Sequence, residues 1–322
     1  MTTLIDRIRE AHSGVRPYVR VTPLDRSAAL STTLGCDVWL KCDFLQPTGS
    51  FKLRGATNKM RLLADSARDT GVITASTGNH GRAVAHAGQV FGVGVTVYIG
   101  NTTPQMKADA IRAAGATLIE IEGGSLEAEI AARQEAERRG IPYVAPYNDF
   151  DTIAGQGTLG MELVEQAADL DAVFVCVGGG GLVSGLGTAL KALSPKTRLI
   201  GVWPEASRCM LDSLHAGEII ATPESPTLSD GSSGAVEPGS VTFPICQQVI
   251  DETLTVSEVE IARAMRQVAL AECWMVEGAA GVALAGLVQT AERYRGKKVA
   301  VVLCGRNVAL DTFVDAMEQG RA

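Results

Sequence analysis

The residues best suited to chemistry lie in the segment 46–56, with the sequence QPTGSFKLRGA. Its proline and Gly49, which tolerates positive φ, predict a turn. A helix is expected to begin at Phe51, with Ser50 as its N-cap. Lys52 then lies in the first helical turn between apolar neighbours, where the helix dipole and desolvation both favour the neutral amine. A neutral lysine amine can form an imine with a carbonyl compound, so Lys52 is either a catalytic nucleophile or a solvated surface lysine.

A run of four glycines, Gly178–Gly181, follows the apolar stretch 172–177 and precedes a helical pattern. Consecutive glycines let backbone N–H groups converge on an anion, and the dipole of the following helix adds to the attraction. A tight turn between a strand and a helix would need only one or two glycines. The run therefore predicts a phosphate-binding turn, and it is not a P-loop because no Gly-Lys-Ser/Thr ending follows.

A second glycine pattern, Gly155–Gly160, fits the dinucleotide motif G-x-G-x-x-G. The preceding residues 148–152 form a polar turn instead of a strand, and no acidic residue follows about 20 positions later to bind a ribose. A nicotinamide-binding site is therefore the weaker interpretation of this chain.

Two further segments carry polar or nucleophilic groups at the ends of strand-like runs. The sequence STGNHG at 76–81 could hold a carboxylate with its hydroxyl and N–H groups, or it could be a capped helix start with a surface histidine. His80 and His86 do not share a helix face, so they do not predict a metal pair. Cys304 ends an apolar strand, where open α/β sheets bind ligands, although a core cysteine is the commoner case.

The composition describes a globular enzyme. The 322 residues, 46% of them hydrophobic and 20% charged, predict two domains. A net charge of −7 with scattered basic residues argues against nucleic acid as a partner. Seven cysteines without a Cys-x-x-Cys pair favour a reduced cytoplasmic protein. The N-terminus has no apolar signal core, and glycines interrupt the uncharged stretch 172–190, so no membrane partner is expected.

Strand-like and helical patterns alternate over residues 72–145 and again from residue 154 onward, which predicts parallel, helix-covered sheets. Strands are expected at 38–41, 72–75, 93–99, 117–121, 143–145, 172–177, 199–203 and 299–303. Helices are expected at 4–12, 58–67, 82–90, 103–114, 125–139, 156–166, 182–193, 256–271 and 278–289. The irregular segment 221–240, rich in Ser, Gly and Pro, is expected to be a functional loop.

Together these motifs resemble those of the fold-type II pyridoxal-phosphate enzymes, in particular the threonine/serine dehydratase and serine racemase family. The matching segments cover nearly the whole chain: 46–56, 77–81, 154–160, 178–181, 230–231, 277–281 and 304–307. The resemblance implies an α/β fold of two open, mostly parallel, helix-covered sheets, similar to the tryptophan synthase β subunit. It also implies a large cofactor-binding domain of residues 1–70 and 149–322, and a small domain of residues 71–148 that closes over the substrate.

The resemblance implies a role for individual residues. Lys52 would bind pyridoxal 5′-phosphate covalently, Asn79 would face its 3′-oxygen, and Cys304 would meet its pyridine nitrogen. The other implied cofactor contacts are Phe51, Gly178, Gly179, Gly180 and Gly181. The implied substrate contacts are Ser76, Thr77, Asn79, His80 and Asn148.

Several positions depart from the residues common in this family. Cys304 stands where serine is common, Arg306 stands where glycine is common, and Thr77 replaces the serine that serves racemases as second proton donor. Trp203 stands where metal-dependent members carry glutamate, and Cys209 stands at the second acidic position. Neither suits a hard divalent cation, so we expect no metal site there.

The resemblance implies a pyridoxal-phosphate-dependent ammonia-lyase that removes water from an L-β-hydroxy amino acid of the threonine or serine type. The products would be a 2-oxo acid and ammonia. A thiol at Cys304 is a weak donor, so the pyridine nitrogen should not be firmly protonated, which favours early loss of the β-hydroxyl.

Other functions remain open. An amino-acid racemase and a β-replacing synthase are alternatives on the same fold, although His80 resembles the dehydratases more than the synthases. A nicotinamide-dependent oxidoreductase and a non-catalytic ligand sensor are alternatives of other classes. The resemblance also implies a homodimer, and the 18 residues after Cys304 leave no room for a regulatory domain.

Overall fold

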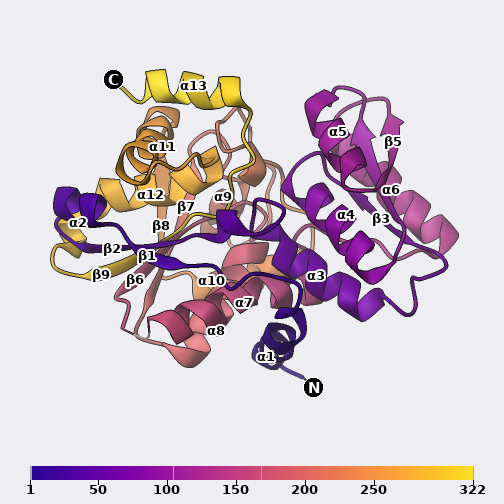
Figure 1. Ribbon diagram of the computed structural model, residues 1–322, viewed down its shortest axis with the longest axis horizontal. Helices are drawn as coiled ribbons and strands as arrows, with labels where there is room; N and C mark the ends of the chain where they lie inside the picture. The colour runs from indigo at the N-terminus through magenta and orange to yellow at the C-terminus, as the bar shows by residue number, and fades with distance from the viewer. Residues whose placement is uncertain (1, 104, 168, 322) are drawn as a thin grey trace.

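The computed structural model describes residues 2–103, 105–167 and 169–321. Within these residues the chain forms two open sheets that helices cover (Figure 1). The larger sheet has the strand order β1-β2-β9-β6-β7-β8, and the smaller has the order β3-β4-β5. Every strand pair is parallel except β1 with β2. The predicted α/β fold with mostly parallel sheets is therefore confirmed.

The larger sheet is built from segments far apart in the sequence. Its strands are β1 (Leu24–Arg26), β2 (Asp37–Lys41), β6 (Ala172–Cys176), β7 (Arg198–Pro204), β8 (Glu252–Val256) and β9 (Lys298–Val302). The central strands β6 and β9 are apolar throughout most of their length and almost entirely buried. Strands covered on both faces need such continuous apolar runs, which explains why both are evident in the sequence.

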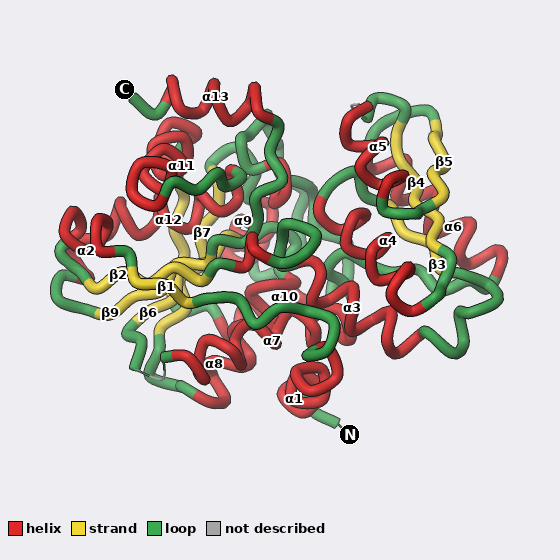
Figure 2. Tube along the Cα trace, viewed as in Figure 1, coloured by secondary structure: helices red, strands yellow, loops and turns green. Residues whose placement is uncertain are grey.

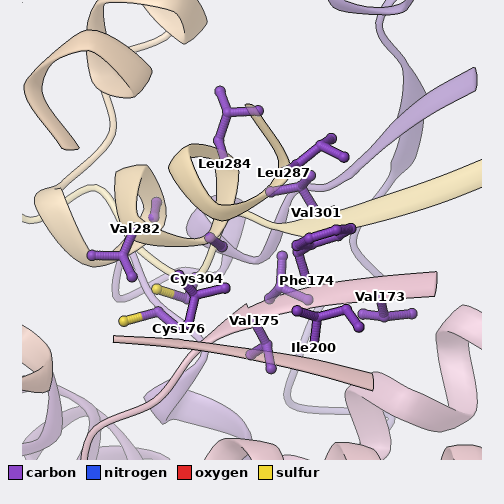
Figure 3. Packing of buried hydrophobic residues seen from close by; sticks show 14 of the residues in the cluster. Val173, Phe174, Val175, Cys176, Ile200, Val282, Leu284, Leu287, Val301 and Cys304 are labelled. Atoms are coloured by element: carbon purple, nitrogen blue, oxygen red, sulfur yellow. The ribbon is translucent and has the colours of Figure 1, made fainter. Parts of the chain in front are cut away.

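Helices cover both faces of the larger sheet. On one face lie α11 (Glu258–Glu272), α12 (Gly278–Thr290) and α13 (Leu310–Gln319), and on the other lie α7 (Phe150–Gln166), α8 (Gly181–Leu193) and α10 (Thr242–Val249) (Figure 2). The remaining helices of this part are α1 (Leu4–Val15), α2 (Ala28–Leu34), α3 (Lys52–Leu63) and α9 (Cys209–Ala216). In Figure 3, Leu287 of α12 lies beside Val301 of the sheet and close to Phe174.

The smaller sheet lies to the right in Figure 1 and comes from one continuous stretch of chain. Its strands are β3 (Val72–Ala75), β4 (Val95–Gly100) and β5 (Thr117–Ile121), and its helices are α4 (Asn79–Phe91), α5 (Gln105–Ala113) and α6 (Ser125–Arg139). Helix α3 packs against both α4 and α7, so it joins the two parts of the molecule.

Two predictions were wrong: one strand does not form, and one helix begins later than expected. Residues 143–145 form no strand, because Tyr143 makes only an isolated bridge with Ile73 and the flanking prolines lack the N–H groups that a longer ladder needs. Val256 ends strand β8 instead of beginning a helix, and α11 starts after Ser257, whose hydroxyl caps it. Strand β8 is half-buried and rich in Glu and Thr, so it lacks the apolar run that revealed β6 and β9.

The starts of two other helices also differ from the prediction. Helix α7 begins six residues earlier than expected, at Phe150, because the carboxylate of Asp149 accepts two N–H bonds of its first turn. Ser50 does not cap α3: the N-cap is Phe51, and the buried hydroxyl of Ser50 has no hydrogen-bond partner. Elements that the sequence patterns did not predict are β1, β8, α2, α9, α10 and α13.

Candidate active site

Lys52 and Cys304 are brought together by backbone pairing between two distant segments. The N–H of Phe51 donates to the carbonyl oxygen of Cys304 at 2.9 Å, and the N–H of Arg306 donates to Gly49 at 2.9 Å. Gly49 has a φ of +81°, as predicted for this turn. A β-carbon there would also collide with Asn307, so glycine is required for both reasons. The lysine segment is thereby held at the carboxyl end of β9.

The amine of Lys52 lies in surroundings that favour its neutral form. Burial lowers the pKa of Lys52 to about 8, although Cys304 and Glu277 act in the opposite direction. Its Nζ donates to the carbonyl oxygen of Pro146 at 2.8 Å and lies 5.2 Å from the centre of the Phe51 ring. The predicted shift thus has the right direction, and desolvation is its largest cause. A primary amine with this pKa is a competent nucleophile near pH 8.

The glycine run joins β6 to α8, as the sequence predicts. Gly180 has a φ of +87°, and a β-carbon on Gly179 would lie 2.7 Å from the ring of Tyr147. Among the described residues, the backbone N–H groups of Gly179 and Gly180 have no hydrogen-bond acceptor. Free N–H groups at a helix N-terminus form an anion-binding site, so this turn can hold a phosphate.

Residues 76–81 form a second helix N-terminus, that of α4. The hydroxyl of Ser76 accepts from the N–H of Gly78 at 3.2 Å, and Thr77 is half-buried in the same turn. Within the described part of the chain, the N–H groups of Asn79, His80 and Gly81 have no acceptor. They can hold a carboxylate in the manner predicted for this segment.

The imidazole of His80 is bonded to a backbone carbonyl group and does not face solvent. It is buried, and its Nε2 donates to the carbonyl oxygen of Val144 at 3.0 Å. Burial and the nearby Lys52 lower the pKa of His80 to about 3, so the ring is neutral and its unpaired Nδ1 can only accept a hydrogen bond. An acceptor cannot bind a carboxylate, which leaves the backbone N–H of His80 as its contact with an anion.

Asn79 belongs to a network that sequence reasoning missed. Its Nδ2 donates to Oε1 of Glu277 at 2.8 Å, and Nδ2 of Asn307 donates to its Oδ1 at 2.5 Å. The other carboxylate oxygen of Glu277 accepts the N–H of Asn307 at 2.9 Å. Glu277 is only 3% exposed, and burial raises the pKa of Glu277 to about 7. The sequence signal was one acidic residue immediately before an apolar, small-residue helix.

Cys304 is a buried thiol at the same edge of the sheet. Burial, followed by Glu277, raises the pKa of Cys304 well above its ordinary value, so the sulfur stays protonated. Figure 3 shows its sulfur beside that of Cys176, and burial raises the pKa of Cys176 to about 11. The pair forms a neutral, weakly polar end to the site.

Asn148 lies two residues after Pro146, whose carbonyl oxygen binds Lys52, and its side chain contacts the irregular loop 221–240. Its Nδ2 donates to Oε2 of Glu237 at 2.8 Å, and its Oδ1 accepts the N–H of Val241 at 2.9 Å. The loop therefore contributes to the surroundings of a predicted substrate residue.

The Gly155–Gly160 pattern and Trp203 have roles in packing. The pattern Gly155–Gly160 lies inside α7, and a β-carbon on Gly155 would meet the carbonyl oxygen of Arg54 at 2.5 Å. Its glycines therefore permit close packing of α7 against α3 and α8, and they do not form the strand-to-helix turn of a dinucleotide site. Trp203 is buried in β7. In the described part of the chain, no three His, Cys, Asp or Glu side chains gather as a candidate metal site.

Over the described residues, no helix combines the length and the apolar character needed to cross a bilayer.

The residues present fit pyridoxal 5′-phosphate. The amine of Lys52 can bind an aldehyde, the free N–H groups of Gly179 and Gly180 can bind a phosphate, and the thiol of Cys304 offers a neutral partner to a ring nitrogen. Backbone pairing between the lysine segment and residues 304–306 joins the first and third of these groups.

Comparisons with known proteins agree with this geometry. Residues 15–305 match the family described as pyridoxal-phosphate dependent enzyme. The chain is 39% identical over 321 residues to the L-threonine ammonia-lyase of Thermotoga maritima, covering 99% of this chain and 79% of that protein. It is 35% identical over 316 residues to the L-threo-3-hydroxyaspartate ammonia-lyase of Saccharomyces cerevisiae, covering 97% of each. The structure of processed threonine deaminase isoform 2 from Solanum lycopersicum matches with a TM-score of 0.94 at 34% identity, covering 98% of this chain and 93% of that one. The chain belongs to the family of pyridoxal-phosphate-dependent enzymes.

Proposed function

We propose that the protein is an ammonia-lyase that removes water from L-threonine, L-serine or a related L-β-hydroxy amino acid. The observation that carries this proposal is the position of Lys52, whose low-pKa amine is held beside a free anion-binding turn and a second helix N-terminus. The ammonia-lyases among the relatives support the reaction type.

Pyridoxal 5′-phosphate bound in this site supplies an aldehyde and an electron-withdrawing ring that acidify the Cα–H bond of an amino acid. The turn at Gly179 and Gly180 would bind the phosphate, and Lys52 would bind the aldehyde carbon. The N–H groups of Asn79, His80 and Gly81 would bind the substrate carboxylate at the positive end of α4.

Lys52 is also the group that would take the α-proton. Its pKa of about 8 means that a substantial fraction of the amine is neutral near that pH and can accept a proton. The carbonyl oxygen of Pro146 would hold the resulting ammonium in place. The Cys304 thiol keeps its proton and is a weak donor, so it would not protonate the ring nitrogen, and this favours loss of the β-hydroxyl.

Racemisation is the competing reaction on this site. A racemase needs a second proton donor on the face opposite the lysine, where we place Thr77. The extra methyl group of threonine restricts χ1 and crowds that face. We expect elimination to exceed racemisation clearly, as chiral chromatography after incubation with L-serine will show. Accumulation of D-serine as fast as pyruvate would contradict this assignment.

The proposed function is tested by product analysis of the purified holoenzyme. L-threonine and L-serine should each yield a 2-oxo acid and ammonia in equal amounts, and the protein should absorb in the violet as a lysine-bound cofactor does. A protein that reduces nicotinamide, or that binds the amino acids without releasing ammonia, would overturn the proposal. A screen of further β-hydroxy amino acids would then rank the substrates.

We further propose that residues 71–148 act as a small domain that closes over the substrate, and that the enzyme is a cytoplasmic homodimer. The separate sheet β3-β4-β5 supports the division of the chain. Light scattering of the purified protein will give its mass, and the mass of a monomer would contradict the dimer.

A further inference from the structure

The segment 146–148 leads from the lysine to an acidic side chain outside the site described so far. The carbonyl oxygen of Pro146 accepts from Lys52 Nζ, and the ring of Tyr147 packs on Gly179. Asn148 then donates to Glu237 at 2.8 Å. Consecutive Cα atoms are about 3.8 Å apart, so Asn148 lies within about 8 Å of Pro146 along the chain. Glu237 therefore contacts the residue that lies two positions after the carbonyl group bound by Lys52.

Glu237 is held in place from three directions. Its Oε1 accepts from Nη2 of Arg133 on α6 at 2.5 Å, its Oε2 accepts from Asn148, and its backbone N–H donates to the hydroxyl of Tyr147 at 3.0 Å. Its side chain is 22% exposed, so it is mostly withdrawn from water. The carboxylate is consequently a fixed charge beside the substrate region, with little freedom to turn away.

The guanidinium that pairs with Glu237 is shared with a second carboxylate. Nη2 of Arg133 also donates to Oε1 of Glu129 at 3.0 Å, so two carboxylates depend on one guanidinium. Burial, and repulsion by Glu237, raise the pKa of Glu129 despite its pairing with Arg133. The three side chains carry one surplus negative charge when both carboxylates are ionised. Arg133 is therefore already engaged and offers no free cation to an additional anion.

We propose that Glu237 determines the side-chain specificity of the enzyme, by admitting β-hydroxy amino acids with neutral or hydrogen-bond-donating side chains and rejecting those with a carboxylate. This inference rests on the proposed ammonia-lyase function. A substrate carboxylate beside Asn148 meets the like charge of Glu237 at short range in a partly desolvated site, where repulsion is strong. The same position tolerates the methyl group of threonine, which carries no charge.

The relative named L-threo-3-hydroxyaspartate ammonia-lyase supplies the substrate class for the test. We would measure kcat/KM of the holoenzyme for L-threonine and for L-threo-3-hydroxyaspartate. The wild-type enzyme should prefer L-threonine at least tenfold. Glu237→Gln removes the negative charge beside Asn148 and with it the repulsion of a substrate carboxylate, so the ratio of hydroxyaspartate to threonine activity should rise at least tenfold.

The matched control is Glu224→Gln in the same loop. The Oε1 of Glu224 accepts from the Ser207 hydroxyl and the Gly234 N–H, and it does not contact Asn148. This variant should keep the wild-type ratio. A ratio that is unchanged in Glu237→Gln, or that rises equally in both variants, overturns the inference.

A second measurement uses the wild-type enzyme and needs no variant to fold. L-2-aminobutyrate and L-aspartate lack the leaving hydroxyl of the two substrates, and we expect L-2-aminobutyrate to inhibit at a concentration at least tenfold lower. Equal inhibition overturns the inference while leaving the proposed function intact. A wild-type enzyme that releases ammonia from neither substrate overturns the proposed function, and this inference with it.

Discussion

Glu277 shows how burial changes the properties of a single carboxylate at the candidate site. Two of its contacts, with Asn79 and with the backbone of Asn307, require an acceptor, and the ionised carboxylate satisfies both. Burial, with a further contribution from Asp230, raises the pKa of Glu277, and the hydrogen bonds from Asn79 and Asn307 act in the opposite direction. We infer that Glu277 positions the Asn79 amide and acts through it.

The pH profile of activity tests this role. The pKa of Glu277 is raised to about 7, so the carboxylate is ionised above pH 7 and protonated below it. Ordering of Asn79 should therefore improve as the pH rises, and kcat/KM should increase through a step near pH 7. Glu277→Gln should abolish this step, because glutamine does not ionise. A step near pH 7 that persists in the variant would refute the role of Glu277.

Individual site residues could be predicted where their sequence neighbours define the local structure. Contacts between residues far apart in the chain could not be predicted. Lys52 and the glycine run stand out because their neighbours in the chain define the turn that presents them. Glu277 meets Asn79 across 198 residues and Glu237 meets Asn148 across 89, so neither pair has a local pattern. The tautomer of His80 could not be predicted either, because it depends on the carbonyl group of Val144, 64 residues away.

Helix α3 is the element that carries the lysine, and a buried ionic network fixes it. Arg54, two residues after Lys52, bonds to Asp43 and to Glu162 at 2.7 Å each, and Lys41 bonds to Glu162 at 2.7 Å. All four side chains are at most 2% exposed. The network ties α3 to β2 and α7, so it holds the start of the helix where the lysine is needed.

Arg54→Met should therefore be strongly destabilising. It leaves Asp43 and Glu162 buried with Lys41 as their remaining cation, and breaking a buried pair in this way typically lowers the free energy of unfolding by about 3–5 kcal/mol. Denaturant titration of the two proteins will measure the change. Arg68→Met, which removes an exposed pair with Asp65, serves as the control and should leave the unfolding midpoint unchanged. Equal stability of Arg54→Met and the wild type would show that the network does not anchor α3.

Glycine patterns were the most ambiguous signal at the element scale. Gly178–Gly181 and Gly155–Gly160 are both rich in glycine, yet the first leads from a strand into a helix and the second lies within a helix. In α7 the absent side chains let α3 and α8 approach: Gly157 is a close neighbour of Gly185, and Gly160 of Ala189. The flanking sequence separated the two patterns, because only the first follows an apolar strand.

For the whole molecule, the alternation of strands and helices was sufficient to predict the class of fold. The strand order was beyond reach, because β2 pairs with β9 across most of the chain. Contacts between the part that holds the smaller sheet and the rest of the molecule could not be predicted either. Lys107 of α5 pairs with Asp230 at 2.7 Å, and Arg133 of α6 pairs with Glu237. Both ion pairs join the helices of the smaller sheet to loop 221–240, which the sequence predicted to be functional without indicating these partners.

Independence from divalent cations is a prediction about the whole enzyme. Trp203 is buried where metal-dependent members of the family carry a carboxylate. A metal that binds only the folded state would raise the melting temperature by mass action. We expect EDTA to change neither the melting curve nor the turnover rate. A loss of stability or rate on chelation that Mg²⁺ restores would reveal a displaced cation site.

The most direct test of the account is to identify the lysine that binds the cofactor. Borohydride reduction of the holoenzyme fixes the cofactor on its lysine, and peptide mapping by mass spectrometry then locates the pyridoxyl group. Lys52 should carry the label, because burial lowers its pKa to about 8 and its amine lies beside the glycine turn. Lys41 should carry none, since its Nζ is buried against Glu162. A label on Lys41 or Lys107 in place of Lys52 would contradict the assignment of the active site.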